Sequence, residues 1–193
     1  MKFTGSREID LSKEKVWRSL RDVVVLEASI PGCESFERTE SEADTESYRS
    51  VIVTRIGPMK AKFSGKMTIE DADPPNYYKL VGSGTAGPAG AARGEVAIKL
   101  EAISPEKTKV DFDASVAMSG RIAQIGGKMI NGSAEAFTSE FFQNLSKNAV
   151  ASIEEVTKAS EFKVLIPGVR KGRLILVTAI IAIILLACWL YLR

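Results

Sequence analysis

The chain has 193 residues, of which 45% are hydrophobic and 26% are charged, and its formal net charge is +2. This length allows one globular domain with a sizeable core and a short appendage. Histidine is absent, which excludes Ser-His-Asp and Cys-His catalysis and the usual zinc and iron ligand sets.

The first thirty residues predict one strand and two short helices. Residues 2–10 alternate apolar and polar side chains, as a strand does. Ser12 is placed to cap a short helix that reaches Leu20, and Val23–Ile30 is a second short apolar run. Pro31-Gly32 then gives a turn that leads into the next strand.

Strand patterns occupy nearly all of the next ninety residues. In Met59–Asp71 and Lys109–Ser119, apolar and polar side chains alternate, so each strand has one apolar face and one polar, solvent-exposed face. Such two-faced strands are typical of an antiparallel sheet. The six predicted strands are Cys33–Thr39, Glu46–Thr54, Met59–Asp71, Tyr77–Ser83, Ala92–Ile103 and Lys109–Ser119.

The run Arg121–Ser160 is the only long segment with a helical period and no proline. It is the only predicted element that is long enough to cover the apolar face of the sheet. Residues 1–160 are therefore expected to form one α+β domain, in which a curved seven-stranded antiparallel sheet grips a long C-terminal helix.

Small residues lie where this sheet and helix should meet, so an apolar pocket is expected between them. Gly65 and Ala114 lie on apolar strand faces, and Gly126 and Gly127 lie in the first part of the helix. The alternative is a plainly packed core. The residues expected to line the pocket and bind its ligand are Phe63, Met67, Phe112, Met118, Ile122, Ile125, Met129 and Phe137.

The C-terminal part predicts a membrane anchor. Leu174–Leu192 contains 19 residues without a charge, and as a helix it would span about 28 Å, the thickness of the bilayer core. Residues 161–173 form a basic linker that is broken at Pro167-Gly168. Because four basic residues precede the anchor and one follows it, the domain is expected in the cytoplasm, held by a single-pass anchor in the cytoplasmic membrane.

Several other motifs predict no chemistry. Residues 1–161 carry 21 basic and 24 acidic side chains, so nucleic-acid binding is not expected. The G-x-G-x-x-G at residues 82–87 is followed by another strand, which indicates a flexible hairpin loop and no dinucleotide site. Cys33 is expected to be a buried structural cysteine, and the Asp111/Asp113 pair to be solvated. We therefore predict no catalytic residues, no metal site and no enzyme activity.

Four segments together resemble the G subunit of carbon monoxide dehydrogenase. They are the turn Pro31-Gly32-Cys33-Glu34, the strand start Ile56-Gly57-Pro58-Met59 with residues 60–66, the glycine-rich loop 82–94 and residues 120–126. The resemblance covers about residues 1–150 and implies the helix-grip fold of the START and birch-pollen-allergen superfamily. It also implies an accessory protein that brings a molybdenum hydroxylase of the carbon monoxide dehydrogenase type to the membrane.

The leading hypothesis is a non-catalytic, membrane-anchored adaptor that binds an apolar isoprenoid, with a quinone as the first candidate, and couples the hydroxylase to the respiratory chain. No covalently bound cofactor is expected. One alternative is a docking protein with a filled core, which recruits the enzyme through the 82–94 loop and the acidic surface. Others are a lipid-binding or transfer protein with another partner and an enzyme of the polyketide cyclase type, for which Tyr48 or Asp113 would matter.

Overall fold

The computed structural model describes residues 1–39 and 45–164. The order in the sheet is β1-β7-β6-β5-β4-β3-β2, and every neighbouring pair is antiparallel. The predicted seven-stranded sheet with a C-terminal helix is therefore confirmed, with small differences at the strand ends. The elements are β1 (Lys2–Ile9), α1 (Lys13–Ser19), α2 (Val23–Ser29), β2 (Cys33–Thr39), β3 (Ser47–Ile56), β4 (Met59–Asp73), β5 (Tyr77–Thr85), the 3-10 helix η1 (Gly87–Ala89), β6 (Ala91–Ser104), β7 (Lys107–Ser119), the 3-10 helix η2 (Gly120–Gln124) and α3 (Gly127–Val164).

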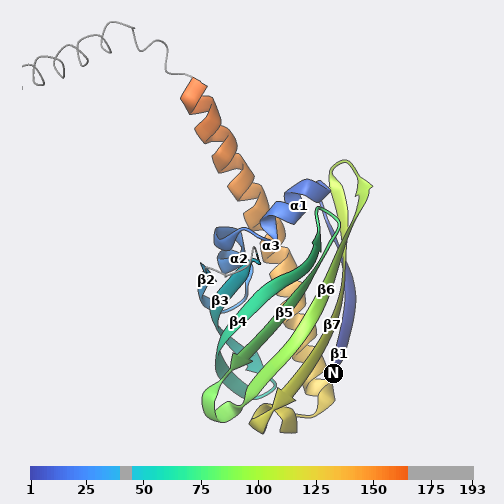
Figure 1. Ribbon diagram of the computed structural model, residues 1–193, viewed down its shortest axis with the longest axis vertical. Coiled ribbons are helices and arrows are strands. Elements are labelled where there is room, and N and C mark those ends of the chain that lie inside the picture. Colours follow the sequence, from blue (N-terminus) through green and yellow to red (C-terminus); the bar gives the residue numbers. More distant parts are fainter. Residues whose placement is uncertain (40–44, 165–193) are drawn as a thin grey trace, which may run out of the picture. The chain divides into compact units, whose positions relative to one another are not determined.

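The sheet curves around the part of α3 up to Ser152, which runs along its inner face (Figure 1). Along each strand, alternate side chains point to this inner face and to the outer face. On β4 the outer residues Lys60, Lys62 and Lys66 are exposed, whereas Ala61 and Ile69 are buried. The sheet, α1, α2 and α3 as far as Ser152 form one compact unit, and residues 153–193 are a second unit.

The core is tightly packed at the end of the sheet where α1 and α2 lie. Val16 and Trp17 of α1 and Val25 and Leu26 of α2 are buried there. Asp22 caps α2, because its carboxylate accepts hydrogen bonds from the backbone N–H groups of residues 24 and 25. Ser12 precedes α1 as expected, but its side chain makes no capping hydrogen bond. The strand residues buried at this end are Ile9, Phe36, Tyr48, Ile69, Tyr78, Leu100 and Val110.

Two sets of polar contacts hold α3 in place. Near the packed end, Asn148 donates to the hydroxyl of Ser29 on α2 at 3.0 Å, and Asn144 donates to the Ser29 carbonyl at 3.3 Å. Further toward the start of α3, the backbone N–H of Gly57 donates to the Ser133 hydroxyl at 3.0 Å. Between these two attachments the helix faces the sheet across apolar side chains.

The start and end of the long helix differ from the prediction. The predicted helix from Arg121 is wrong in its first residues, because residues 120–124 form η2, Ile125 is extended and α3 begins at Gly127. Gly126 and Gly127 favour this break, since glycine loses the most backbone freedom in a helix. At its other end α3 runs past Ser160 to Val164, into the segment predicted as linker.

The predicted membrane anchor Leu174–Leu192 and the rest of the basic linker lie outside the described residues. Within residues 1–39 and 45–164, no helix is both long enough and apolar enough to cross a membrane.

Candidate functional site

A cavity of about 520 Å³ lies between the inner face of the sheet and α3. Its lining is almost entirely apolar, with side chains from all seven strands, α3 and the α1 and α2 region. Two open grooves of about 710 and 800 Å³ lie on the opposite face of the sheet, and Arg49, Lys66 and Arg93 line both of them. An apolar space of several hundred Å³ inside the fold is the usual form of a small-molecule site, so the inner cavity is the candidate site.

The cavity exists because the inner face is covered incompletely beyond the packed end. Met67, Leu80 and Ile98 point inward from β4, β5 and β6, yet each keeps solvent-accessible surface. Further along the same strands lie glycines, where Gly65 pairs with Gly84 and Gly82 pairs with Gly94. These glycines line the grooves of the opposite face and are not part of the cavity lining.

Aromatic rings and one ion-paired cluster close the cavity at the packed end. The rings of Trp17 and Tyr78 meet edge to face with centroids 5.5 Å apart, and the Arg21 guanidinium lies 5.0 Å from the Trp17 ring centroid. Tyr48 packs against Phe36 with ring centroids 5.3 Å apart. The Trp17–Tyr78 contact joins α1 to β5, and the Phe36–Tyr48 contact joins β2 to β3.

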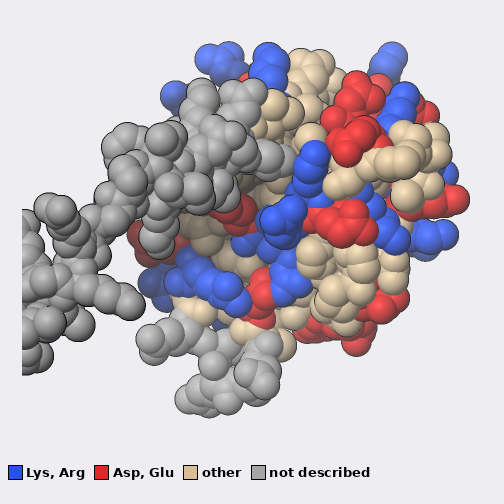
Figure 2. Space-filling view, turned by 90° about the horizontal axis from the view of Figure 1, so that it is seen from above, with Lys and Arg blue, Asp and Glu red and all other residues tan. Residues whose placement is uncertain are grey.

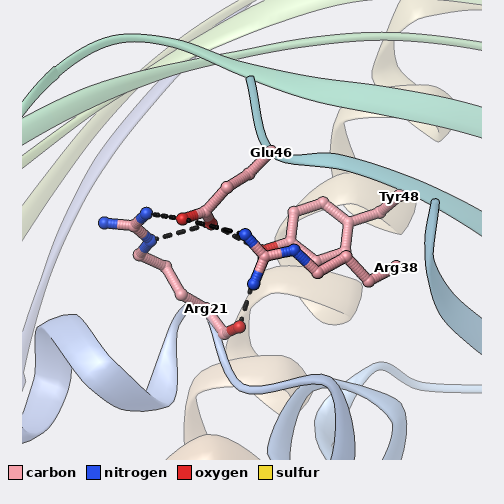
Figure 3. Close-up of polar contacts among 4 residues, drawn as sticks. All are labelled: Arg21, Arg38, Glu46 and Tyr48. Atoms are coloured by element: carbon pink, nitrogen blue, oxygen red, sulfur yellow. Dashed lines mark hydrogen bonds and ion pairs between the residues drawn. The ribbon is translucent and has the colours of Figure 1, made fainter. Parts of the chain in front are cut away.

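Glu46 is the centre of the polar cluster at this end (Figure 3). Its carboxylate forms a salt bridge with Arg21 and accepts hydrogen bonds from Arg21 Nε at 3.0 Å and from the Tyr48 hydroxyl at 2.9 Å. Arg38 adds a longer ion pair of 3.4 Å from a more exposed position. The surface at this end carries a mixture of positive and negative side chains (Figure 2).

Two tyrosines of the closed end line the cavity. The Tyr48 hydroxyl donates to Glu46, and burial raises the Tyr48 pKa although Arg38 and Arg21 oppose the shift. Tyr78 is 2% exposed, and none of the buried side-chain nitrogen and oxygen atoms in the described residues lacks a hydrogen-bond partner. Burial raises the pKa of Tyr78 well above its usual range, so this hydroxyl is protonated at neutral pH.

A surface groove of about 580 Å³ adjoins the cavity between β3 and α3. The groove and the cavity share Thr54, Arg55, Ser133 and Phe137 as lining residues. Met129, which is 50% exposed, covers part of the groove beside Gly57. The Gly57–Ser133 hydrogen bond crosses this seam. This groove is the candidate mouth of the cavity.

The predicted pocket residues divide into two groups. Met67, Phe112, Met118 and Phe137 line the cavity. Phe63 is half-buried outside the lining, Ile122 is completely buried in η2, and Ile125 and Met129 lie near Gly57 at the surface. The break before Gly127 explains the positions of Ile122 and Ile125, because these residues do not continue the inward face of α3. Met129 belongs to α3 itself and lies on the side of the helix next to Gly57.

Sequence reasoning missed most of the closed end and the aromatic part of α3. Phe141 and Phe142 both line the cavity, and Phe142 stacks on Phe112 with ring centroids 6.0 Å apart. Tyr78 and Leu80 could have been found, because alternation along β5 places them on the same face. Tyr48 could not, since its role depends on the loop after α1.

The other sequence motifs contribute nothing to this site. Residues 82–94 do form a hairpin, but residues 82–85 are paired in β5 and the loop is shorter than predicted. Asp113 is exposed on the outer face, and Asp111 pairs with Lys109 at 3.0 Å. Cys33 is half-buried, not fully buried as predicted. In the described part of the chain, no cluster of three or more His, Cys, Asp or Glu residues could hold a metal ion.

Replacing Gly5 with alanine should destabilise the domain, because the ring of Phe112 lies directly against this glycine. A Cβ atom at position 5 would lie 2.3 Å from Phe112 Cζ, so the ring would have to move into the cavity. Overpacking of this kind costs about 1–3 kcal/mol, so we expect the melting temperature to fall by several degrees. Gly126→Ala is the matched control, since a Cβ there meets nothing within 4 Å. Equal stability of the two variants would contradict this packing.

Two comparisons identify close similarities. The family model described as the G subunit of carbon monoxide dehydrogenase (CoxG) matches residues 5–150. A conserved protein from Geobacillus kaustophilus, known from its crystal structure, is 32% identical with a TM-score of 0.72, and the match covers 79% of this chain and 97% of that one. A search of the curated proteins gives no match.

More distant structures share the fold alone. A START superfamily protein from Mycobacterium smegmatis is 12% identical with a TM-score of 0.60, covering 78% of this chain and 97% of that one. The ZhuI aromatase/cyclase from Streptomyces sp. R1128 is also 12% identical, with a TM-score of 0.57 and coverage of 79% and 95%. These neighbours are helix-grip proteins, as the sheet order and α3 indicate.

Proposed function

Because this chain belongs to the CoxG family of carbon monoxide dehydrogenase, we propose that it is an accessory protein that carries an apolar ligand for a molybdenum hydroxylase. The ligand that we propose is a quinone. The protein would hold the hydroxylase of the carbon monoxide dehydrogenase type at the cytoplasmic membrane and couple it to the respiratory chain. Its own role would be binding and recruitment, without catalysis.

The observation that carries the ligand part of this proposal is the apolar cavity of about 520 Å³. Burying apolar ligand surface is favourable by about 25 cal/mol per Å², so a wall of carbon atoms is sufficient to retain an isoprenoid quinone. The adjoining groove offers the long tail a path out between β3 and α3. The quinone ring would occupy the cavity, and the isoprenoid tail would occupy the groove.

The membrane part of the proposal depends on the C-terminal sequence. Leu174–Leu192 is long and uncharged enough to anchor the chain, and the basic residues before it favour a cytoplasmic domain. A short linker would keep the domain near the bilayer, which is where quinones are dissolved. The choice of partner depends on the family description.

The ligand can be identified by extraction. We expect the full chain, purified in mild detergent from a host that contains the hydroxylase, to release a quinone into organic solvent in near-stoichiometric amount, as measured by mass spectrometry. Recovery of phospholipid would favour a lipid-binding or transfer protein instead. Recovery of no small molecule would favour a docking protein without a ligand.

Recruitment needs a separate measurement in the same host. Hydroxylase activity should sediment with membranes when the full chain is present and remain in the supernatant when residues 174–193 are deleted. Sedimentation that does not depend on these residues would contradict the anchoring role without affecting the ligand result.

A further inference from the structure

The outer face of the sheet carries a row of three basic residues, which we call the basic row. Arg49 on β3 lies directly opposite Lys66 on β4, and Ser83 on β5 lies between Lys66 and Arg93 on β6. All three basic side chains are exposed, and none forms an ion pair with a residue in 1–39 or 45–164. Like charges directly opposite each other destabilise a sheet, so the free protein bears an unfavourable pair at Arg49 and Lys66.

The groove of about 710 Å³ runs along the basic row and suits carboxylate groups. Besides the three basic residues, its lining has three serine hydroxyl groups and, among the described residues, no acidic side chain. The rest of the lining is mostly glycine and alanine, which lets another chain approach the strand backbone closely. The neighbouring groove of about 800 Å³ contains the same basic residues but also Glu70 and Glu95.

Acidic side chains around the basic row limit the size of a partner that it can attract. Glu37 lies opposite Arg49, and Glu95 and Asp113 are exposed on the same outer face. A broad anionic bilayer would meet these carboxylates as well as the basic row, whereas a short segment can contact the row alone. From β3 to β6 the row spans three strand spacings, or about 14 Å, which four or five extended residues cover.

We propose that the basic row is the docking surface for a short acidic segment of the hydroxylase, whose carboxylates pair with Arg49, Lys66 and Arg93. This inference rests on the recruitment part of the proposed function and adds the surface and the chemistry of the partner. Arginine side chains bind carboxylates through paired hydrogen bonds, and docking also relieves the repulsion between Arg49 and Lys66. The groove shares no lining residue with the mouth groove, so the docked segment leaves the mouth free.

The variant Lys66→Glu separates binding from stability. It replaces the like-charge pair with an opposite-charge pair across from Arg49, so the melting temperature should stay equal or rise. The affinity of an acidic partner should fall, because one attraction becomes a repulsion. Lys128→Glu is the matched control, since it makes the same change of charge at an exposed position near the start of α3.

The first measurement titrates the full chain in non-ionic detergent with fluorescently labelled hexaglutamate and follows the anisotropy at low salt. Lys66→Glu should weaken binding at least about 10-fold. Lys128→Glu should change binding by less than about twofold, because distant exposed charges are screened. Equal effects of the two variants, or no binding to the wild type, would overturn the proposal. Displacement of the peptide by phosphatidylglycerol added to the micelles would assign the row to lipid headgroups and also overturn it.

The second measurement uses membranes of the host that contains the hydroxylase. Membranes with Lys66→Glu should retain about a tenth or less of the hydroxylase activity that wild-type membranes retain, although the chain itself still sediments. Lys128→Glu should retain the wild-type amount. Equal retention by Lys66→Glu and the wild type would overturn the docking surface while recruitment stands. If wild-type membranes retain no hydroxylase, the recruitment part of the proposed function fails, and the proposal fails with it.

Discussion

Replacing Ala114 with phenylalanine should abolish ligand binding and leave the fold intact. Ala114 lies at the middle of the inner face of β7, between Phe112 and Val116, and it lines the cavity. Its cross-strand neighbours are Phe3 and Val96. A benzyl group at this position would occupy the space that we assign to the ligand, so we expect affinity for a decyl-naphthoquinone to fall at least about 100-fold.

The matched control for this variant is Ala117→Phe. Ala117 lies on the same strand but on the outer face, where it is exposed. The control adds the same side chain to β7 without entering the cavity, so its ligand affinity should equal that of the wild type. Circular dichroism and the melting temperature should show that both variants are folded. Wild-type affinity in Ala114→Phe would place the ligand outside this cavity.

The strand faces were predictable because alternation has a period of two. Once the apolar face of β4 and β7 was read from the sequence, the inward positions of Met67, Phe112 and Met118 followed directly. The same rule explains why Lys60 and Lys62 are exposed. No knowledge of the helix was needed for these residues, and the structure places them as expected.

The helix residues were harder to predict because their direction depends on where the helix begins. A continuous helix from Arg121 would have carried Ile122, Ile125 and Met129 on the same face as Phe137. The structure instead breaks the chain at Ile125 and Gly126, so η2 buries Ile122 by itself. Within α3, Ile130 and Phe137 face the cavity, whereas Met129 lies on another side of the helix and is half exposed.

The polar contacts of the closed end could not be read from the sequence. Glu46 and Tyr48 are two residues apart, but Arg21 comes from a separate segment, and nothing in the sequence indicates that one carboxylate joins all three. Periodicity therefore predicts which face a side chain occupies, whereas hydrogen-bond partners require the tertiary structure.

Replacing Glu46 with alanine should cause a large loss of stability. The Glu46 side chain is 17% exposed, and that of its main partner Arg21 is 23% exposed. Removing the carboxylate would leave the Arg21 guanidinium without its acceptor in a mostly buried position and would leave the Tyr48 hydroxyl only the longer contact of 3.5 Å to the Arg21 carbonyl. Breaking a pair in such a place costs about 2–4 kcal/mol, so for a chain of this size the melting temperature should fall by about 5–12 °C.

Two variants separate the buried cluster from ordinary surface charge. Arg38 pairs with the same carboxylate at 3.4 Å, but its side chain is 58% exposed, so Arg38→Ala should cost no more than about 1 kcal/mol. Glu46→Gln keeps an oxygen that can accept a hydrogen bond from Tyr48. Its free energy of unfolding, measured with denaturant, should therefore lie between those of Glu46→Ala and Arg38→Ala. Because Tyr48 lines the cavity, Glu46→Ala should also weaken ligand binding, whereas Arg38→Ala should not. Equal unfolding free energies for Glu46→Ala and Arg38→Ala would show that the cluster behaves as a surface ion pair and does not hold the closed end together.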